Sequence, residues 1–205
     1  MSLKPIVLDI ETSGINKIKC GIWQIGAIDL ETGEEFFDEG RIDDGDIISV
    51  SGKKPALEVI GKTEEELRDK NKQSQKQLLE NFFKWIDKRL MKNFLCQNPQ
   101  FDVAFLEIKA MKYGLKIPFH YRSFDLHNIA QTRFYDLNKK FLIKEDHSDM
   151  GLTNILKLCG MEDNRKAHNA LQDCKLTGEC FYRLIKGKNL FPEYSQYEIP
   201  EVLKK

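Results

Sequence analysis

The sequence has no excess of charge of either sign. Lysine plus arginine and aspartate plus glutamate both number 32 in its 205 residues, so the formal net charge is zero. Domains that bind nucleic acid often carry a surplus of positive charge that attracts phosphates. Composition therefore gives no electrostatic reason to expect a nucleic-acid partner, and any such partner has to be inferred from a site.

Paired cysteines, clustered histidines and long apolar runs are also lacking. The cysteines are odd in number and form no CxxC motif, which predicts buried free thiols in a reducing compartment; they are Cys20, Cys96, Cys159, Cys174 and Cys180. No apolar run approaches the length that spans a bilayer, and the N-terminal residues show no apolar core or cleavage site of a signal peptide. We therefore expect a cytoplasmic protein with no membrane partner.

Without repeats, low-complexity tracts or linkers, the chain has a length that suits one α/β domain. β-branched and alternating patterns predict strands over residues 5–11, 23–30, 34–42, 93–96 and 121–124. Apolar residues at helical spacing predict helices beginning at Thr63 and Gln77, the second with Leu90 on its apolar face, and over 101–115, 126–135, 151–159 and 170–185. Residues 43–54 and 138–150 are predicted loops, and 190–205 an extended tail. This order predicts a mixed sheet covered by helices.

On the apolar face of the helix over 101–115 we expect Phe101, Ala104, Phe105, Ile108 and Met111.

Two carboxylates share one face at the end of the first predicted strand. Asp9 and Glu11 are two residues apart, and side chains at that spacing point the same way. Close carboxylates repel each other unless a cation lies between them. A solvated strand end explains this pair equally well, so the pair alone is weak evidence.

Three further polar residues lie where predicted helices begin. Asp102 follows a predicted strand, and His168 and Asp173 flank the start of the last helix. Taken singly, each has a simpler reading: Asp102 and Asp173 as first-turn acids, Asn169 as a helix cap and His168 as an exposed loop residue.

Together the five residues have a chemical logic. Mg²⁺ prefers carboxylate oxygens, and two such ions about 3.5–4 Å apart can hold the attacking and leaving oxygens of a phosphodiester. A histidine with a pKa near ~6.5 suits the acceptance of a proton from the attacking water. A zinc site would need histidines near one another, and the other three show no such spacing.

Three motifs in order resemble the DEDD superfamily of 3′→5′ exonucleases, in its histidine-bearing subgroup. That group includes proofreading exonucleases of bacterial replicases, RNase T and oligoribonuclease. The motifs are VLDIETSG at 7–14, NPQFDVAFL at 98–106 and HNALQD at 168–173. The segment GLTNILKLCG at 151–160 resembles the helix before the third motif, and Val59–Thr63 with Leu67 resembles the stretch after the third strand.

The resemblance implies a fold, an activity and a role for each residue. It implies a ribonuclease H-like five-stranded mixed sheet, with an exonuclease domain over 1–189 and a tail over 190–205. Two Mg²⁺ or Mn²⁺ ions would be bridged by Asp9, with Glu11 and Asp173 on the metal that activates water and Asp102 on the other. His168 would be the general base. Thr12, Ile15, Asn98 and Phe101 would contact the single-stranded or frayed 3′ end.

One departure from the family pattern is Gln97, where many members have histidine before the second motif's asparagine; it puts substrate preference in question. Three alternatives are open: an idle nucleic-acid-binding module of this fold, a structural protein whose acids cap helices, and an RNA-trimming enzyme of the RNase T or oligoribonuclease type. Basic and aromatic residues that could flank the site are Lys139, Lys140, Lys144, Arg165, Lys166, Phe134, Tyr135 and Phe141.

We expect DNA as the substrate, because the second motif and the absence of extra domains resemble the proofreading type more closely. A homodimer or a polymerase-associated complex is the expected assembly.

Overall fold

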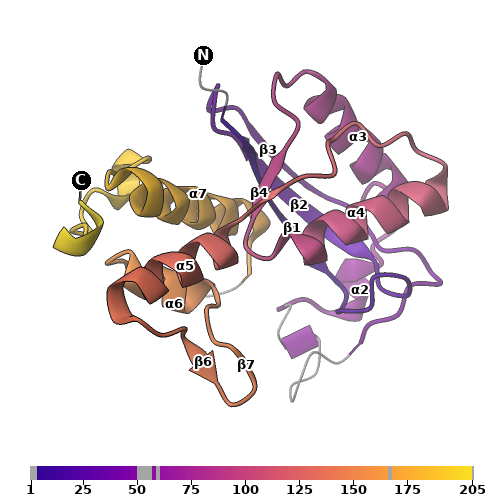
Figure 1. Ribbon diagram of the computed structural model, residues 1–205. Helices are drawn as coiled ribbons and strands as arrows, with labels where there is room; N and C mark the ends of the chain where they lie inside the picture. Colours follow the sequence, from indigo (N-terminus) through magenta and orange to yellow (C-terminus); the bar gives the residue numbers. More distant parts are fainter. Residues whose placement is uncertain (1–3, 50–56, 59–60, 166–167, 205) are drawn as a thin grey trace.

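The computed structural model describes residues 4–49, 57–58, 61–165 and 168–204. At its centre is a mixed five-stranded sheet with the strand order β3-β2-β1-β4-β5 (Figure 1). The strands are β1 (Ile6–Thr12), β2 (Ile22–Asp29), β3 (Glu35–Glu39), β4 (Phe94–Cys96) and β5 (Phe124–Asp125). The first three form an antiparallel meander, whereas β4 pairs parallel to β1 and β5 parallel to β4. The expected mixed five-stranded sheet is thus confirmed.

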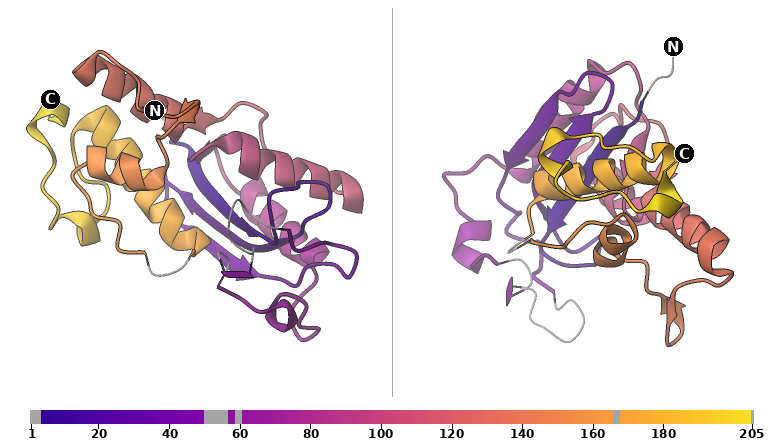
Figure 2. Two further views of the ribbon diagram at one scale, coloured as in Figure 1. Left: turned by 90° about the horizontal axis from the view of Figure 1, so that it is seen from below. Right: turned by 90° about the vertical axis from the view of Figure 1, so that its left-hand side faces the viewer.

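Helices cover both faces of this sheet (Figures 1 and 2). One face carries α3 (Gln75–Asp87) and α4 (Pro99–Tyr113), and α7 (Ala170–Lys186) lies on the other. Against α7 pack α5 (Leu126–Asn138) and α6 (Leu152–Leu158). The short α2 (Glu64–Leu67) begins with the expected capping box at Thr63.

The alternation along β1 decides which of its side chains reach the site. Ile6, Leu8 and Ile10 belong to the core shared with α3 and α4, whereas Val7 belongs to the core shared with α7. Because strand side chains alternate between faces, Asp9 and Glu11 follow Val7 on the α7 side. Both acids therefore face the N-terminal end of α7 at the end of the strand.

The predicted loop over 138–150 is wrong in its middle. A small hairpin of β6 (Ile143–Lys144) and β7 (His147–Ser148) forms there. Its anchors are long-range polar contacts, since His127 Nε2 lies 2.7 Å from Ser148 Oγ and the Gln131 amide donates to the Leu142 carbonyl. Such contacts leave no period in the local sequence.

Two helical faces also differ from expectation. Helix α3 ends at the cap Lys88, so Leu90 lies beyond it and is exposed. Helix α4 begins at Pro99, and its buried face carries Asp102 and Lys109, whereas Met111 is exposed. The buried face of α4 was predicted wrongly from hydrophobic periodicity, because two charged residues lie on that face.

Strand β5 is also shorter than expected: of 121–124 only Phe124 belongs to it, and Tyr121 is exposed.

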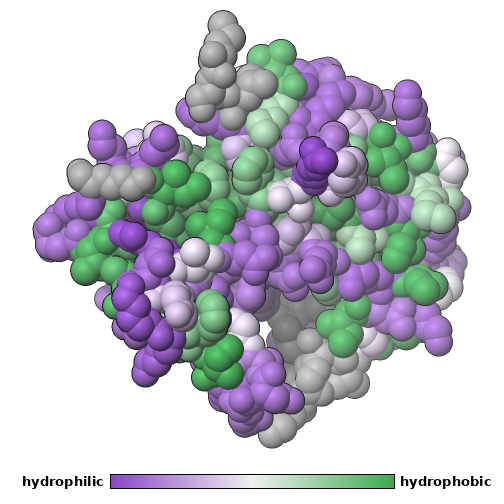
Figure 3. All heavy atoms as spheres, in the orientation of Figure 1, coloured by the Kyte–Doolittle hydropathy of each residue, from purple (hydrophilic) through white to green (hydrophobic). Residues whose placement is uncertain are grey.

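The segment after α7 packs back onto the domain. It contains two short 3-10 helices, η1 (Pro192–Tyr194) and η2 (Glu201–Leu203), where an extended chain was expected. Leu203 is buried, and Glu179 accepts hydrogen bonds from the amides of Leu190 and Phe191. On the face shown in Figure 3, hydrophilic and hydrophobic residues are interspersed. Within the described residues, none of the helices is long and apolar enough to cross a membrane.

Each cysteine lies in the described part of the chain as a buried free thiol, as expected. Lys166, which was expected to flank the site, falls outside the described residues, as do residues 59–60 of the stretch that resembles the one after the third strand.

Candidate active site

The five residues singled out in the sequence come together in one pocket. Asp9, Glu11, Asp102, His168 and Asp173 all line a cavity of about 390 Å³. The four expected substrate contacts line the same cavity: Thr12, Ile15, Asn98 and Phe101. Residues that are far apart in the sequence, on β1, on α4 and at the start of α7, thus line one pocket.

A glycine on β2 lets α7 approach the sheet closely. Gly26 pairs with Asp9 across the β1–β2 ladder, and a Cβ atom there would lie 2.4 Å from the backbone of Ala170 and Leu171. The Ala170 amide donates to Gln24 Oε1 at 2.8 Å, which fixes the first turn of α7 to β2. This contact places Asp173, in that first turn, opposite the acids of β1.

Asp102 is held at the other side of the pocket by the backbone of β1. Its Oδ1 accepts a hydrogen bond from the Ile10 amide at 3.1 Å, and the side chain is buried. Helix α4 begins with Pro99 in its first turn, a position where the missing amide hydrogen costs nothing. Asn98 before it has a φ of 67°, a left-handed conformation that asparagine tolerates better than most residues.

His168 lies just before α7 at the mouth of the acidic cluster. Its Nδ1 is 3.8 Å from Asp173 Oδ2 and 4.0 Å from Glu11 Oε1, and about half of the side chain (49%) is exposed. Asn169 caps the helix by accepting from the Gln172 amide. One potential ligand atom each from Glu11, His168 and Asp173 lies within 4.8 Å of the other two.

The electrostatics of the pocket show more negative charge than the protein neutralises. Burial, together with the neighbouring carboxylates, raises the pKa of Asp9 well above its ordinary value. Burial also raises the pKa of Asp102 to about 8 and that of Glu11 to about 7. The nearby carboxylate of Asp173, together with the charge of Glu11, raises the pKa of His168. Such shifts are typical of a site that a cation would complete.

Arg165 is the arginine that lines the same pocket. Its Nη1 donates to both carboxylate oxygens of Asp173 at 3.2 Å, and its Nε and Nη2 donate to Asp163 at 2.8 and 2.7 Å. The sequence placed Arg165 only among the basic residues that could flank the site, and it gave no reason to single out Asp163. The position of Arg165, three residues before His168, is the one signal in the sequence that could have indicated its contact with Asp173.

The donors fit a hard divalent cation. Carboxylate oxygens dominate the cluster, and one imidazole lies beside them, which suits Mg²⁺ or Mn²⁺. The raised pKa values of Asp9, Glu11 and Asp102 are the structural observation in favour of this fit, because bound cations would relieve the same repulsion.

Comparison with known proteins agrees with this geometry. A family model described as exonuclease, of the RNase T type, matches residues 6–181, most of the chain. The chain belongs to this exonuclease family. It is a phosphodiester hydrolase of the DEDD 3′→5′ exonucleases in their histidine subgroup, as the sequence resemblance implied.

Similar individual proteins extend along nearly the whole chain. Ribonuclease T of Vibrio parahaemolyticus is 26% identical over 201 residues, which cover 88% of this chain and 85% of that protein. Ribonuclease T of Vibrio campbellii is equally similar, with the same identity and coverage.

Solved structures show the same fold at lower identity. The nuclease domain of 3′hExo, a DEDDh family member bound to rAMP, matches with a TM-score of 0.63 at 17% identity, covering 96% of this chain and 95% of that one. Escherichia coli Exonuclease I in complex with a dT13 oligonucleotide matches with a TM-score of 0.64 at 17% identity. That match covers 88% of this chain and 41% of Exonuclease I.

Proposed function

We propose that this exonuclease removes nucleoside 5′-monophosphates from single-stranded or frayed 3′ ends by a two-metal mechanism. The observation that carries the proposal is the convergence of four carboxylates and one histidine in the pocket that Thr12 and Phe101 also line. A structural role as helix caps does not account for the convergence of these buried carboxylates in one pocket, and an idle binding module would not need all five residues.

The carboxylates would hold Mg²⁺ or Mn²⁺. Asp9 would bridge two ions, Glu11 and Asp173 would bind one of them, and Asp102 would hold the other through water. When bound, such ions supply Lewis-acid stabilisation of the phosphoryl oxygens and lower the pKa of a bound water. Asp102 is already oriented for this role by the Ile10 amide.

His168 would accept the proton of the attacking water. Its ring lies beside Glu11 and Asp173, whose negative charges stabilise the protonated imidazolium. Because half of the ring is exposed, the proton can pass on to solvent after each cycle. Arg165 would keep Asp173 oriented, since it binds both oxygens of that carboxylate and is itself held by Asp163.

Two walls would receive the terminal nucleotide. Thr12 and Ile15 belong to the end of β1 and the loop after it, and Asn98 and Phe101 belong to the start of α4. Ile15 is largely exposed, and Phe101 lies on the opposite element, so a base can be contacted from both sides. A free strand end fits such a pocket more readily than a continuous duplex.

DNA is the proposed substrate, with RNA trimming as the second candidate. The second motif of the sequence favours DNA, whereas the similarity to proteins named Ribonuclease T along most of the chain favours RNA. Digestion of 5′-labelled single- and double-stranded DNA and RNA with Mg²⁺ or Mn²⁺ distinguishes them. A ladder that shortens with single-stranded DNA, and more slowly with RNA, is expected. Faster digestion of RNA than of DNA would make RNA trimming the first candidate. If none of the four substrates were digested, the proposed exonuclease function would be refuted.

We also propose a cytoplasmic location, which the five free cysteines support. A homodimer or a polymerase-associated complex stays a prediction, and the oligomeric state can be measured by light scattering.

A further inference from the structure

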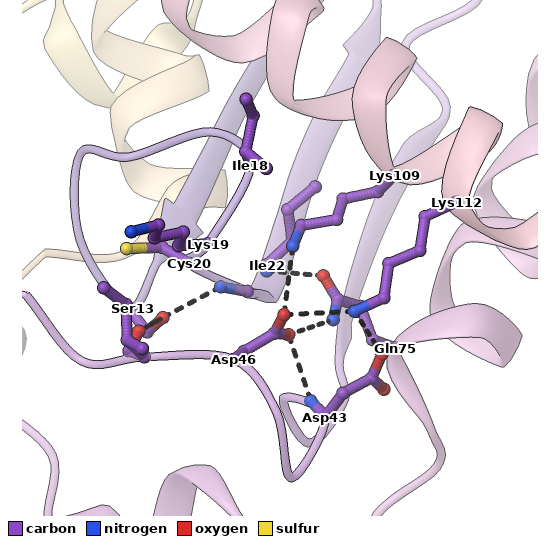
Figure 4. Close-up of polar contacts among 12 residues, drawn as sticks. Ser13, Ile18, Lys19, Cys20, Ile22, Asp43, Asp46, Gln75, Lys109 and Lys112 are labelled. Carbon is purple, nitrogen blue, oxygen red and sulfur yellow. Dashed lines mark hydrogen bonds and ion pairs between the residues drawn. The ribbon is translucent and has the colours of Figure 1, made fainter.

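A buried charged cluster lies on the α4 side of the sheet, outside the acidic site. Lys109 on α4 is fully buried, and its Nζ donates to Asp46 Oδ1 at 3.1 Å (Figure 4). Lys112 donates to the same oxygen at 3.1 Å and lies 2.7 Å from Asp43 Oδ2. Gln75 at the start of α3 donates to Asp46 Oδ2 at 2.7 Å. Burial would raise the pKa of Asp46, but Lys109 and these hydrogen bonds outweigh it and lower the pKa.

Stability alone is a poor explanation for this ion pair. Removing two charges from water is costly, and a buried pair is often no more stabilising than apolar side chains of similar volume. The best-attested benefit of a buried polar pair is that it fixes one arrangement of the elements it joins. The elements joined here are α4 and the segment 43–49.

The segment around Asp46 supports the loop after β1. The Ser13 hydroxyl donates to the Ile47 carbonyl at 2.7 Å, and the Ser49 amide donates to the Ser13 carbonyl at 3.0 Å. The Ile47 amide donates to the Lys19 carbonyl at 2.8 Å. Both ends of the loop over residues 13–19 are thus bound to this segment.

Glycines make this support tight. A Cβ atom on Gly14, which lines the pocket, would lie 2.0 Å from Ser49 Oγ, and one on Gly21 would lie 2.5 Å from Asp46 Oδ2. The loop therefore rests directly on the segment that Asp46 anchors. A shift of that segment would move the loop that carries Ile15.

The other partner of the ion pair belongs to the opposite wall of the pocket. Asp102 and Lys109 are both buried on α4, and a separation of seven residues puts them on one face, roughly 10 Å apart along the helix. Asp102 fixes the first turn of α4 to β1, and Lys109 fixes the helix two turns later to Asp46. Phe101 lies at the start of this doubly anchored helix.

We propose that Asp46 and Lys109 are positioning residues for substrate binding. Their ion pair joins α4 to the segment 43–49, which supports the loop over 13–19, and so sets the gap between Ile15 and Phe101 that receives the 3′-terminal nucleoside. This inference rests on the proposed function. The Asp46–Lys109 ion pair would affect the KM for a nucleic-acid 3′ end, whereas the acids of the active site and His168 control kcat.

The test is steady-state kinetics of Lys109→Met on a 5′-labelled oligonucleotide with saturating Mn²⁺, well below the melting temperature. Methionine keeps the buried stem and removes the charge. We expect KM to rise about fivefold or more with kcat within about twofold of the original enzyme. Combination with Ile15→Ala should add little to either single effect, because both changes act on the same gap between Ile15 and Phe101.

Glu179→Gln is the matched control. Glu179 forms a second fully buried ion pair, with Arg183 at 2.7 Å, but it anchors the segment after α7. The Glu179→Gln substitution should lower stability and leave KM unchanged. A rise in KM equal to that of Lys109→Met would contradict a specific role for Asp46 and Lys109. An unchanged KM in Lys109→Met, or effects that multiply with Ile15→Ala, would overturn the proposal.

If Lys109→Met does not fold, Lys112→Met replaces it, since Lys112 is partly exposed and binds the same carboxylate. A KM increase of about twofold is then expected, and an unchanged KM would overturn the positioning role. If the unaltered enzyme digests no oligonucleotide, the proposed function fails. Digestion by the unaltered enzyme with no change in KM refutes only the positioning role.

Discussion

Asp9 has unfavourable electrostatic surroundings in the pocket. Burial and the charges of Asp102, Glu11 and Asp173 all raise its pKa. Asp9→Asn should therefore raise the melting temperature of the metal-free protein at pH 8 and abolish the stabilisation by Mn²⁺. Differential scanning fluorimetry in EDTA and in Mn²⁺ measures both effects. Asp146→Asn, at an exposed hairpin position, is the control that should change neither.

His168 should control the acid side of the pH–rate profile. As a base it must be unprotonated, and its pKa is raised by Asp173 and Glu11, so the rate should fall as the pH drops through a pKa above the ordinary value of histidine. His168→Ala should lower kcat by about 10²–10⁴ at neutral pH and flatten this limb. His147→Ala, at an exposed hairpin position, should keep both the rate and the profile. A profile unchanged in His168→Ala would remove this residue from the base role.

At the residue scale, the sequence singled out the four acids and the histidine that the structure brings into one pocket, because they belong to three motifs that occur in order. Their catalytic roles stay a prediction. It could not identify the contacts that depend on distant chain segments. The arginine bound to Asp173 and the lysine bound to Asp46 both required the fold. Buried charges follow no period, so a pattern of apolar residues cannot reveal them.

Among the elements, the contact between β2 and α7 is the one that assembles the site. A side chain at Gly26 would collide with the backbone of Ala170 and Leu171 at 2.4 Å, and backbone atoms cannot rotate away. Gly26→Ala should therefore displace the start of α7, lower stability by about 1–3 kcal/mol and reduce kcat about tenfold or more.

Gly151→Ala provides the comparison, since no heavy atom lies within 4 Å of a Cβ there and its φ is −71°. Urea denaturation and initial rates measure both variants. If Gly26→Ala matched Gly151→Ala in both, close packing of α7 on β2 would not be what positions Asp173.

The elements themselves were predicted where most of the buried residues are apolar. The strands β1 and β2 and the helices α3, α5 and α7 follow their apolar periods closely. The prediction was wrong for the hairpin of β6 and β7, which His127 and Gln131 anchor from α5, and for the buried face of α4, where Asp102 and Lys109 replace apolar residues. In both places polar contacts between distant residues decide the structure.

For the whole molecule, the acidic pocket should make stability depend on pH. The folded pKa values of Asp102 (about 8) and Glu11 (about 7) lie above their values in the unfolded chain, near ~4. The folded state thus binds protons more tightly, and this stabilisation, complete at low pH, is lost as the pH rises from about 4 to about 8. The raised pKa of His168 acts in the same direction.

We therefore expect a lower melting temperature in EDTA at pH 8 than at pH 6, and a larger gain from Mn²⁺ at pH 8. Asp102→Asn should weaken this dependence of the melting temperature on pH. Asp46 and Asp163, whose pKa values are lowered, affect stability only in more acidic solution. A melting temperature in EDTA that rises from pH 6 to pH 8 would contradict this electrostatic description.

The most direct test of the central claim is the digestion of a 5′-labelled single-stranded oligonucleotide by the protein and by Asp9→Asn. With Mg²⁺ or Mn²⁺ the protein should shorten the labelled strand one nucleotide at a time from its 3′ end, EDTA should stop the reaction, and Asp9→Asn should leave the strand intact. Immediate release of a labelled mononucleotide, internal cleavage, or a ladder that persists in Asp9→Asn would contradict the assignment of this pocket as a 3′→5′ exonuclease site.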